Sequence, residues 1–200
     1  MTKKKKGKFV VLYGINNLGK TTQAKLLAKK LKKNGHKAEY VKYPVYQLEP
    51  AGPLINAYLR KGNPYNFSPR ELQIFHFIDR IKFEPILKDK LNKGINVVAE
   101  DYFGTALAWG VGAGVNRKLL EYLYPFVLKE DLAILFDGQR FRNSIEKNHR
   151  HENNEMLINR VRKAHLWAGK KYGWEKVSAN LSISEISDII WKKVEKILEK

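Results

Sequence analysis

A stretch near the start of the chain has the residue types and the spacing of a phosphate-binding loop, G-x-x-x-x-G-K-T. Its members are Gly14, Asn16, Asn17, Leu18, Gly19, Lys20, Thr21 and Thr22. Glycines let backbone N–H groups turn inward around phosphate oxygens, and the start of the following helix adds a positive dipole end. The lysine of such a loop reaches the β- and γ-phosphates, and its threonine hydroxyl binds Mg²⁺. The sequence therefore predicts a site for a nucleotide with Mg²⁺.

This loop needs a strand before it and a helix after it. The apolar run 9–13 predicts a buried strand, because parallel strands covered on both faces are apolar throughout. Apolar residues at helical spacing follow from Thr21 to about Asn34. A glycine turn that merely joins strand to helix is the less favoured alternative, since both flanks agree with the motif.

The rest of the chain repeats this alternation of short apolar runs and helical patterns. Further strands are predicted at 38–42, 96–99, 132–136 and 174–178. Further helices are predicted at 54–59 (after a loop with Pro50, Gly52 and Pro53), 69–92, 117–128, and around the apolar periods 157–172 and 186–197. This order predicts an α/β, P-loop NTPase-type three-layer fold, with a five-stranded parallel sheet and helices on both faces. We expect one domain over residues 1–200.

Two acids, Glu100 and Asp101, end the predicted third strand. In P-loop enzymes an acid at the carboxyl end of a buried strand meets Mg²⁺ or a substrate hydroxyl. We therefore expect Glu100 to act at the metal together with Thr21, and a helix cap or a solvated turn acid is the alternative. The glycine-rich stretch 104–114 is expected to be a loop packed close to a ligand.

The predicted helix 69–92 has two different faces. It begins with a capping box at Ser68 and a proline in its first turn. One face is an apolar stripe expected in the core: Ile74, Phe75, Ile78 and Ile81. The other face mixes aromatic, cationic and amide groups: Gln73, His76, Phe77, Arg80 and Glu84. This mixture predicts that the second face lines a cleft, and an ordinary amphipathic rim is the alternative.

The segment at about 139–152 is polar and basic, without an apolar period. Its arginines are Arg140, Arg142 and Arg150. We expect a short basic lid that brings guanidinium groups onto phosphates. A solvated basic loop is the alternative.

The composition limits the class of protein. The 200 residues include 38 Lys and Arg against 20 Asp and Glu, and this net charge of +18 favours anionic partners. Nucleotides are favoured over nucleic acid, because the lysines are scattered and no nucleic-acid-binding motif stands out. No apolar run of about 18 residues predicts a membrane span. With no cysteine there is no disulfide or thiolate metal site, and we expect a cytoplasmic protein.

Together these motifs resemble the thymidylate kinase family, over the chain from Lys8 to about Leu198. A wider class of kinases shares the phosphate-binding loop. More specific are Tyr43-Pro44, Asp79-Arg80, the acid and aromatic within 100–102, Arg150-His151-Glu152 and Tyr172-Gly173-Trp174.

The resemblance implies a single P-loop kinase domain that transfers the γ-phosphoryl group of ATP to dTMP with Mg²⁺, giving dTDP for dTTP synthesis. It implies that Lys20 and Thr21 hold ATP and the metal, with Glu100 near the metal and the acceptor phosphate. The acceptor-binding residues it implies are Asn16, Pro44, His76, Phe77, Arg80, Glu100, Thr105 and Trp109. Asn17 supplies no arginine from the loop, so the catalytic guanidinium groups are expected from Arg140, Arg142 and Arg150. Members of the family are typically homodimers.

Departures from the family pattern cluster on the acceptor side. Asn16 stands where the family usually has an acid, Asp101 replaces an arginine, and His76 replaces a phenylalanine that stacks on thymine. Val45-Tyr46 stands where an arginine often follows the proline motif. Another P-loop deoxynucleoside or nucleotide kinase with altered acceptor specificity is therefore one alternative. The other is a non-catalytic P-loop protein that binds polyanions or nucleic acid through its positive charge.

Overall fold

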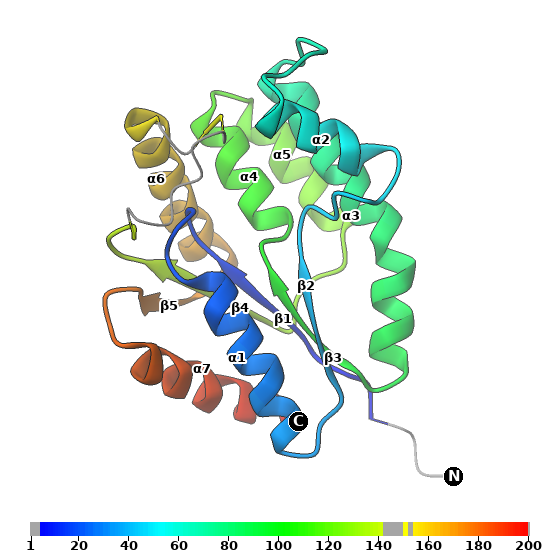
Figure 1. Cartoon of the computed structure of the whole chain (residues 1–200), viewed down its shortest axis with the longest axis vertical. Helices are drawn as coiled ribbons and strands as arrows, with labels where there is room; N and C mark the ends of the chain where they lie inside the picture. The colour runs from blue at the N-terminus through cyan, green and yellow to red at the C-terminus, as the bar shows by residue number, and fades with distance from the viewer. Residues whose placement is uncertain (1–4, 142–149, 152–153, 200) are drawn as a thin grey trace.

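A five-stranded parallel sheet forms the centre of the molecule (Figure 1). The computed structural model describes residues 5–141, 150–151 and 154–199. The strands lie in the order β2-β3-β1-β4-β5, and all four neighbouring pairs are parallel. In chain order they are β1 (Phe9–Tyr13), β2 (Ala38–Lys42), β3 (Asn96–Glu100), β4 (Leu132–Asp137) and β5 (Glu175–Ser178). The predicted α/β fold and its five strands are confirmed.

The register of the sheet brings the carboxyl ends of three strands together. Leu12 of β1 is paired with Glu100 of β3, and Glu100 is paired with Lys42 of β2. Chain segments that leave parallel strands at one edge of a sheet share the crevice beyond that edge. The loop after β1 and the acids at the end of β3 therefore meet there.

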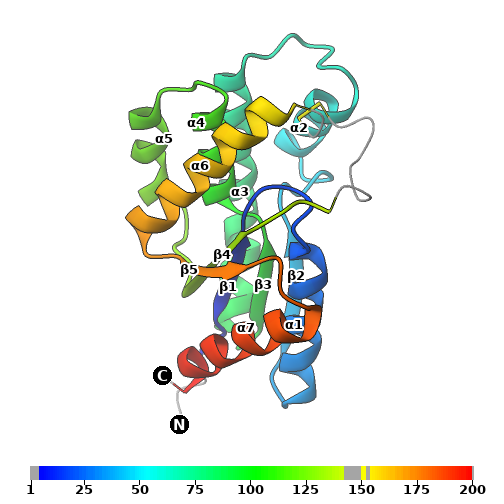
Figure 2. The same cartoon turned by 90° about the vertical axis from the view of Figure 1, so that its left-hand side faces the viewer.

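Helices cover both faces of the sheet, as Figures 1 and 2 show. On one face α1 (Lys20–Lys33) and α7 (Ile183–Leu198) pack side by side, and Leu31 and Val194 are buried in the same cluster as Val10 of β1. The other face is covered by α3 (Pro69–Asn92) and α4 (Phe103–Gly112), which bury Leu87 and Leu107 in a second cluster. The predicted three layers follow from these two clusters.

The glycine-rich stretch after β3 is a helix, so the predicted loop is wrong. Gly104 and Gly112 both lie within α4. A Cβ atom on Gly104 would lie 2.5 Å from Cζ2 of Trp174, and one on Gly112 would lie 2.5 Å from Cγ2 of Val161 on α6 (Glu155–Tyr172). These glycines therefore serve close packing of α4 against its neighbours, and Figure 2 shows α6 crossing α4.

The face of α3 that lies in the core is the polar one, which corrects the predicted apolar stripe. Gln73, His76 and Arg80 are buried, whereas Ile81 is 38% exposed. Ile74 is only half-buried, and Phe75 and Ile78 pack as partly buried residues on a third cluster at α2. The capping box at Ser68 and the predicted ends of this helix are confirmed.

The remaining helices include one that begins earlier than predicted. α2 spans Ala51–Arg60, so Gly52 and Pro53 lie in its first turn and not in a loop. Proline is tolerated there because the first N–H groups of a helix have no partner within it. The predicted helix 117–128 is α5 (Arg117–Leu123) followed by the 3₁₀ turn η1 (Tyr124–Phe126). Within the described ranges, none of these helices has the length and apolar character needed to cross a membrane.

Candidate active site

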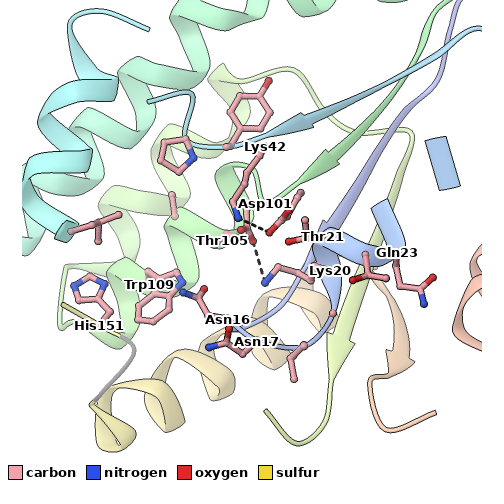
Figure 3. A pocket seen from close by; sticks show the side chains of 18 of the residues that line it. Asn16, Asn17, Lys20, Thr21, Gln23, Lys42, Asp101, Thr105, Trp109 and His151 are labelled. Carbon is pink, nitrogen blue, oxygen red and sulfur yellow. Dashed lines mark hydrogen bonds and ion pairs between the residues drawn. The ribbon is translucent and has the colours of Figure 1, made fainter. Parts of the chain in front are cut away.

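A cavity of about 530 Å³ opens at the carboxyl edge of the sheet (Figure 3). The loop between β1 and α1 forms one wall, and residues of α2, α3 and α4 form the opposite wall. The ends of β2 and β3 close its base with Lys42, Glu100 and Asp101. The phosphate-binding loop and the mixed polar face of α3 therefore line the same cavity. This agrees with the prediction that the mixed face lines a cleft.

The loop has the backbone that its glycines require. Gly14 and Gly19 have φ angles of 138° and 80°, values that side-chain-bearing residues rarely adopt. A Cβ atom on Gly14 would also lie 2.7 Å from the carbonyl oxygen of Phe136. Nζ of Lys20 donates to the carbonyl oxygens of Gly14 (2.9 Å) and Ile15 (2.8 Å). The ammonium group is thus held across the mouth of the loop, where a nucleotide phosphate binds in such motifs.

Asp101 faces this lysine. Its Oδ1 lies 3.6 Å from Nζ of Lys20 and accepts a hydrogen bond of 2.8 Å from Oγ1 of Thr105. Asp101 itself has a left-handed backbone, with φ of 62°. Burial raises the pKa of the Asp101 carboxyl, and neighbouring Glu100 raises it further, while Lys20 and Thr105 oppose the rise. The two adjacent acids therefore differ in their affinity for protons.

Glu100 is held as a carboxylate. Its Oε2 accepts a hydrogen bond of 2.5 Å from the Tyr40 hydroxyl, and Oε1 lies 3.0 Å from Nζ of Lys42. Burial alone would raise the pKa of Glu100, but Lys42, Tyr40 and Lys20 together hold it below the ordinary value for a glutamate. The neighbouring Thr21 side chain lowers the pKa of Glu100 further.

The oxygen donors at this point fit Mg²⁺. This cation prefers hard oxygen ligands and keeps several waters, so one or two protein oxygens with substrate phosphates are enough. The ionised Glu100 and the Thr21 hydroxyl are such donors, and both line this cavity. Among the described residues no group of three or more His, Cys, Asp or Glu forms a separate metal cluster.

On the opposite wall, Arg80 organises a buried polar network. Its Nη1 lies 3.0 Å from Nδ1 of His76 and donates to Oδ2 of Asp79 at 3.2 Å. Its Nη2 donates to the carbonyl oxygen of Tyr102 at 3.3 Å. Oδ1 of Asp79 accepts from the backbone N–H of Val45 (2.9 Å), which ties α3 to the chain beyond β2. Arg80 is 1% exposed, so this network is part of the core as well as of the cavity wall.

The network sets the tautomer of His76. A guanidinium group can only donate hydrogen bonds, so Nδ1 of His76 accepts from Arg80 and the ring proton lies on Nε2. Burial lowers the pKa of His76 well below its usual range, and the charges of Arg80 and His151 lower it further. His76 is therefore a neutral ring that presents an N–H donor and lines the cavity.

An aromatic pair lies beside this wall. The rings of Trp109 and His151 are stacked, with centroids 4.9 Å apart and an interplanar angle of 18° (Figure 3). The neighbouring Arg150 donates its backbone N–H to the carbonyl oxygen of Leu59 (2.9 Å), and its guanidinium lies 5.2 Å from the centre of the Tyr58 ring. Residues 150–151 thus dock on α2 and α4 at the cavity.

The structure brings most of the predicted site residues to this cavity. It is lined by Asn16, Asn17, Leu18, Gly19, Lys20, Thr21, Thr22, Pro44, His76, Arg80, Glu100, Thr105 and Trp109. Gly14 contributes its backbone beneath the loop. Phe77 is not brought there, because it packs on Phe103 in the core.

The predicted lid arginines lie outside the lining of the cavity or outside the described residues. Nη1 of Arg140 lies 3.1 Å from Oε1 of Glu155, and Arg150 docks at Tyr58 as described above. Arg142 lies outside the described residues. Phe141 does line the cavity, and its backbone N–H donates to the carbonyl oxygen of Asn17 at 2.8 Å.

Several residues that line the cavity were not predicted from the sequence. They include Lys42, Arg60 and His151. Lys42 directly precedes the Tyr43-Pro44 motif, and His151 lies within the Arg150-His151-Glu152 motif. Their positions next to or within these family motifs were the signal that could have identified them. Nothing in the sequence around Arg60 indicated a binding site, because an arginine in the last turn of an amphipathic helix is usually exposed to solvent.

Comparison with known proteins agrees with this geometry. The family model for thymidylate kinase matches residues 12–190. Thymidylate kinase of Homo sapiens is 28% identical over 192 residues, covering 93% of this chain and 89% of the human protein. Thymidylate kinase of Buchnera aphidicola is 27% identical, covering 90% of this chain and 91% of its own length. The solved structure of Candida albicans thymidylate kinase has the same fold, with a TM-score of 0.80 and 20% identity over 96% of this chain and 92% of the other. The chain therefore belongs to the thymidylate kinase family, enzymes that use ATP to phosphorylate dTMP.

Proposed function

We propose that this chain transfers the γ-phosphoryl group of ATP to dTMP, giving dTDP, and that its cavity holds both nucleotides. One observation carries the proposal: the phosphate-binding loop and the His76–Arg80 wall line the same cavity, with Glu100 and Asp101 between them. A donor phosphate on the loop would then face an acceptor on the opposite wall. Phosphoryl transfer is catalysed by such positioning and by stabilisation of charge.

On the donor side, the backbone N–H groups of Asn16 to Thr22 would surround the phosphates of ATP. Lys20 exchanges the carbonyl oxygens that it now contacts for the β- and γ-phosphates. Thr21 and Glu100 would hold Mg²⁺, which supplies positive charge to the phosphoryl oxygens when it is bound. Because Glu100 is held ionised by Lys42 and Tyr40, it is ready to bind the cation at neutral pH.

On the acceptor side, the base would lie between Trp109 and the wall formed by His76. The Nε2–H of His76 would donate to a carbonyl oxygen of the pyrimidine, because Arg80 occupies Nδ1. Asn16, Pro44, Arg80 and Thr105 complete this side of the cavity. Asn16 can hydrogen-bond a sugar hydroxyl without adding the charge that the family's usual acid would carry.

The basic segment 139–152 would act as the lid. Its arginines are Arg140, Arg150 and Arg142, the last of which lies outside the described residues. Docking of residues 150–151 on α2 and α4 supports this role, since it ties the end of the segment to the cavity. Guanidinium groups placed on the transferring phosphoryl group stabilise its charge.

A coupled assay of ADP production tests the proposal. The purified chain would be given Mg·ATP with dTMP, dUMP, dCMP, dGMP or thymidine in parallel. We expect the highest kcat/KM with dTMP. Phosphorylation of thymidine alone would contradict a monophosphate acceptor, and DNA binding without kinase activity would favour the polyanion-binding alternative.

We also propose a homodimer that forms along α3 and works in the cytoplasm, where its nucleotide substrates are made. The apolar stripe of α3 supports the dimer, because Ile74 and Ile78 are only half-buried and Ile81 and Ile86 are 38% and 45% exposed. Exposed apolar patches of this kind mark interaction surfaces.

A further inference from the structure

Lys42 places a cation at the base of the cavity. It is the last residue of β2, and the parallel register sets it beside Glu100. Its Nζ lies 3.0 Å from Oε1 of Glu100, and its side chain is 49% exposed whereas that of Glu100 is 6% exposed. Figure 3 shows the side chain of Lys42 reaching down toward Asp101 and Lys20. The ammonium group therefore lies in the cavity and not on the outer surface of the sheet.

The charges near Lys42 bear on how the phosphate of the acceptor nucleotide is bound. The acceptor phosphate must meet the donor's γ-phosphate in line, at the place where Lys20, Glu100 and Asp101 converge. Two carboxyl groups at that place disfavour a dianionic phosphate by charge repulsion. Lys20 and the Mg²⁺ that Thr21 and Glu100 would hold serve the donor phosphates, so a further cation on the acceptor side would offset this repulsion for the acceptor phosphate.

The other cations that line the described part of the cavity have different placements. Lys20 bridges the carbonyl oxygens of its own loop and serves the donor phosphates. Arg80 is 1% exposed and is bonded to Asp79, His76 and Tyr102. Arg60 lies on α2, where its guanidinium is 4.8 Å from the centre of the Tyr46 ring. Lys42 comes from the end of β2, where it is paired with Glu100 and is not tied to the phosphate-binding loop.

We infer that Lys42 binds the phosphate group of the acceptor nucleotide. An ammonium group has three donors, so Lys42 keeps its ion pair with Glu100 and directs a second N–H to a phosphate oxygen. Lys20 on the donor side and Lys42 on the acceptor side then flank the transferring phosphoryl group. The inference rests on the proposed function, because it requires an acceptor that carries a phosphate.

Two simpler roles for Lys42 are possible: neutralising Glu100, and binding the donor. Calorimetric titration separates them, with dTMP, thymidine and a non-hydrolysable Mg·ATP analogue as three separate ligands. The proteins are the wild type, Lys42→Met, Lys42→Arg and the control Lys90→Met. Lys90 is a matched control because it also forms an ion pair with a glutamate (Nζ to Oε2 of Glu39, 2.6 Å) but does not line the cavity.

We expect Lys42→Met to weaken dTMP binding by about 10- to 100-fold, the usual range for a lost hydrogen bond to a charged group. Binding of thymidine and of the ATP analogue should change by less than about threefold. Lys42→Arg should restore most of the affinity for dTMP, and Lys90→Met should behave as the wild type. Loss of the preference for dTMP over thymidine is thus the specific signature.

Two results would overturn the inference alone. Equal weakening of dTMP and thymidine in Lys42→Met would assign Lys42 to the support of Glu100. Weakening of the ATP analogue with dTMP unchanged would assign it to the donor. In both cases the wild type still prefers dTMP, so the proposed function stands. A wild type that binds thymidine as tightly as dTMP would overturn the proposed function, and the inference with it.

Discussion

Nζ of Lys20 lies 3.6 Å from Oδ1 of Asp101, so the loop lysine faces a carboxyl group at the place where it would meet nucleotide phosphates. We predict that Asp101→Asn tightens ATP binding by about three- to tenfold, because a negative charge next to the phosphates is removed. Asparagine tolerates the left-handed backbone at this position and can still accept from Thr105. Calorimetric titration with an ATP analogue measures the change. Asp188→Asn, an exposed acid on α7, controls for the loss of one charge, and weaker ATP binding in Asp101→Asn would contradict the prediction.

The loop lysine itself should matter for catalysis far more than for folding. Lys20→Met keeps the length of the side chain but removes the charge, and we expect turnover to fall by about 10²- to 10³-fold or more. The free energy of unfolding should change by no more than about 2 kcal/mol, because Lys20 makes only a few hydrogen bonds. Steady-state kinetics and denaturant unfolding test both parts. Lys29→Met, an exposed lysine on the same helix, should match the wild type, and near-normal turnover in Lys20→Met would remove the ATP site from this loop.

His76 offers a test of how the acceptor base is read. His76→Phe keeps a ring that can stack but loses the Nε2–H donor. We expect KM for dTMP to rise by about five- to tenfold with KM for ATP unchanged, in line with one lost hydrogen bond. His36→Phe, exposed after α1, is the control. A KM for dTMP that is unchanged or lower would mean that the ring at position 76 acts by stacking alone.

His165 on α6 should make stability depend on pH. Burial lowers its pKa to about 3, and the charge of Lys20 adds to the effect. In the unfolded chain the pKa is about 6.5, so below that pH the unfolded state binds the extra proton. Stability is therefore full above pH 6.5 and falls as the pH drops toward 3, by up to about 1.4 kcal/mol per pH unit for one proton. His76 acts in the same direction.

The variant His165→Leu isolates this contribution. Between about pH 6 and pH 4, its free energy of unfolding should fall less steeply than that of the wild type. The two slopes should differ by up to about 1.4 kcal/mol per pH unit, the value for one proton. Denaturant titrations at several pH values measure both slopes. Identical slopes would mean that His165 is protonated as readily in the folded protein as in the unfolded chain.

The exposed stripe of α3 gives a test of the dimer. Ile81→Glu places a charge in the middle of this stripe, and we expect it to convert a dimer to a monomer, because an unpaired charge is costly to bury. Light scattering after size-exclusion chromatography gives the mass directly. Met156→Glu, on a side chain that is 77% exposed on α6, should leave the mass unchanged. A monomeric wild type would rule out the homodimer.

The two faces of α3 show how far a sequence pattern reaches. Periodicity separated the Ile74–Ile81 stripe from the His76–Arg80 face correctly, because side chains three and four apart share a face of a helix. It assigned the core to the wrong stripe. Arg80 can be buried since Asp79, His76 and the carbonyl oxygen of Tyr102 accept hydrogen bonds from its terminal nitrogens. The first two of these three partners lie within one turn of the same helix, whereas Tyr102 lies after β3. Part of the cost of burial is thus offset by a contact, with Tyr102, that the sequence of a single helix does not reveal.

The sequence by itself determined the phosphate-binding loop, the five strands and the family, since these depend on local spacing, turn residues and apolar runs. The tertiary structure decided which side chains meet in the cavity. Lys42 reaches Glu100 only because β2 and β3 are paired in one register, and His151 reaches Trp109 only because the end of the basic segment docks on α4. Gly104 and Gly112 of α4 likewise pack against Trp174 and Val161, residues that are distant in the sequence. Such contacts join residues far apart in the chain, and local patterns carry no information about them.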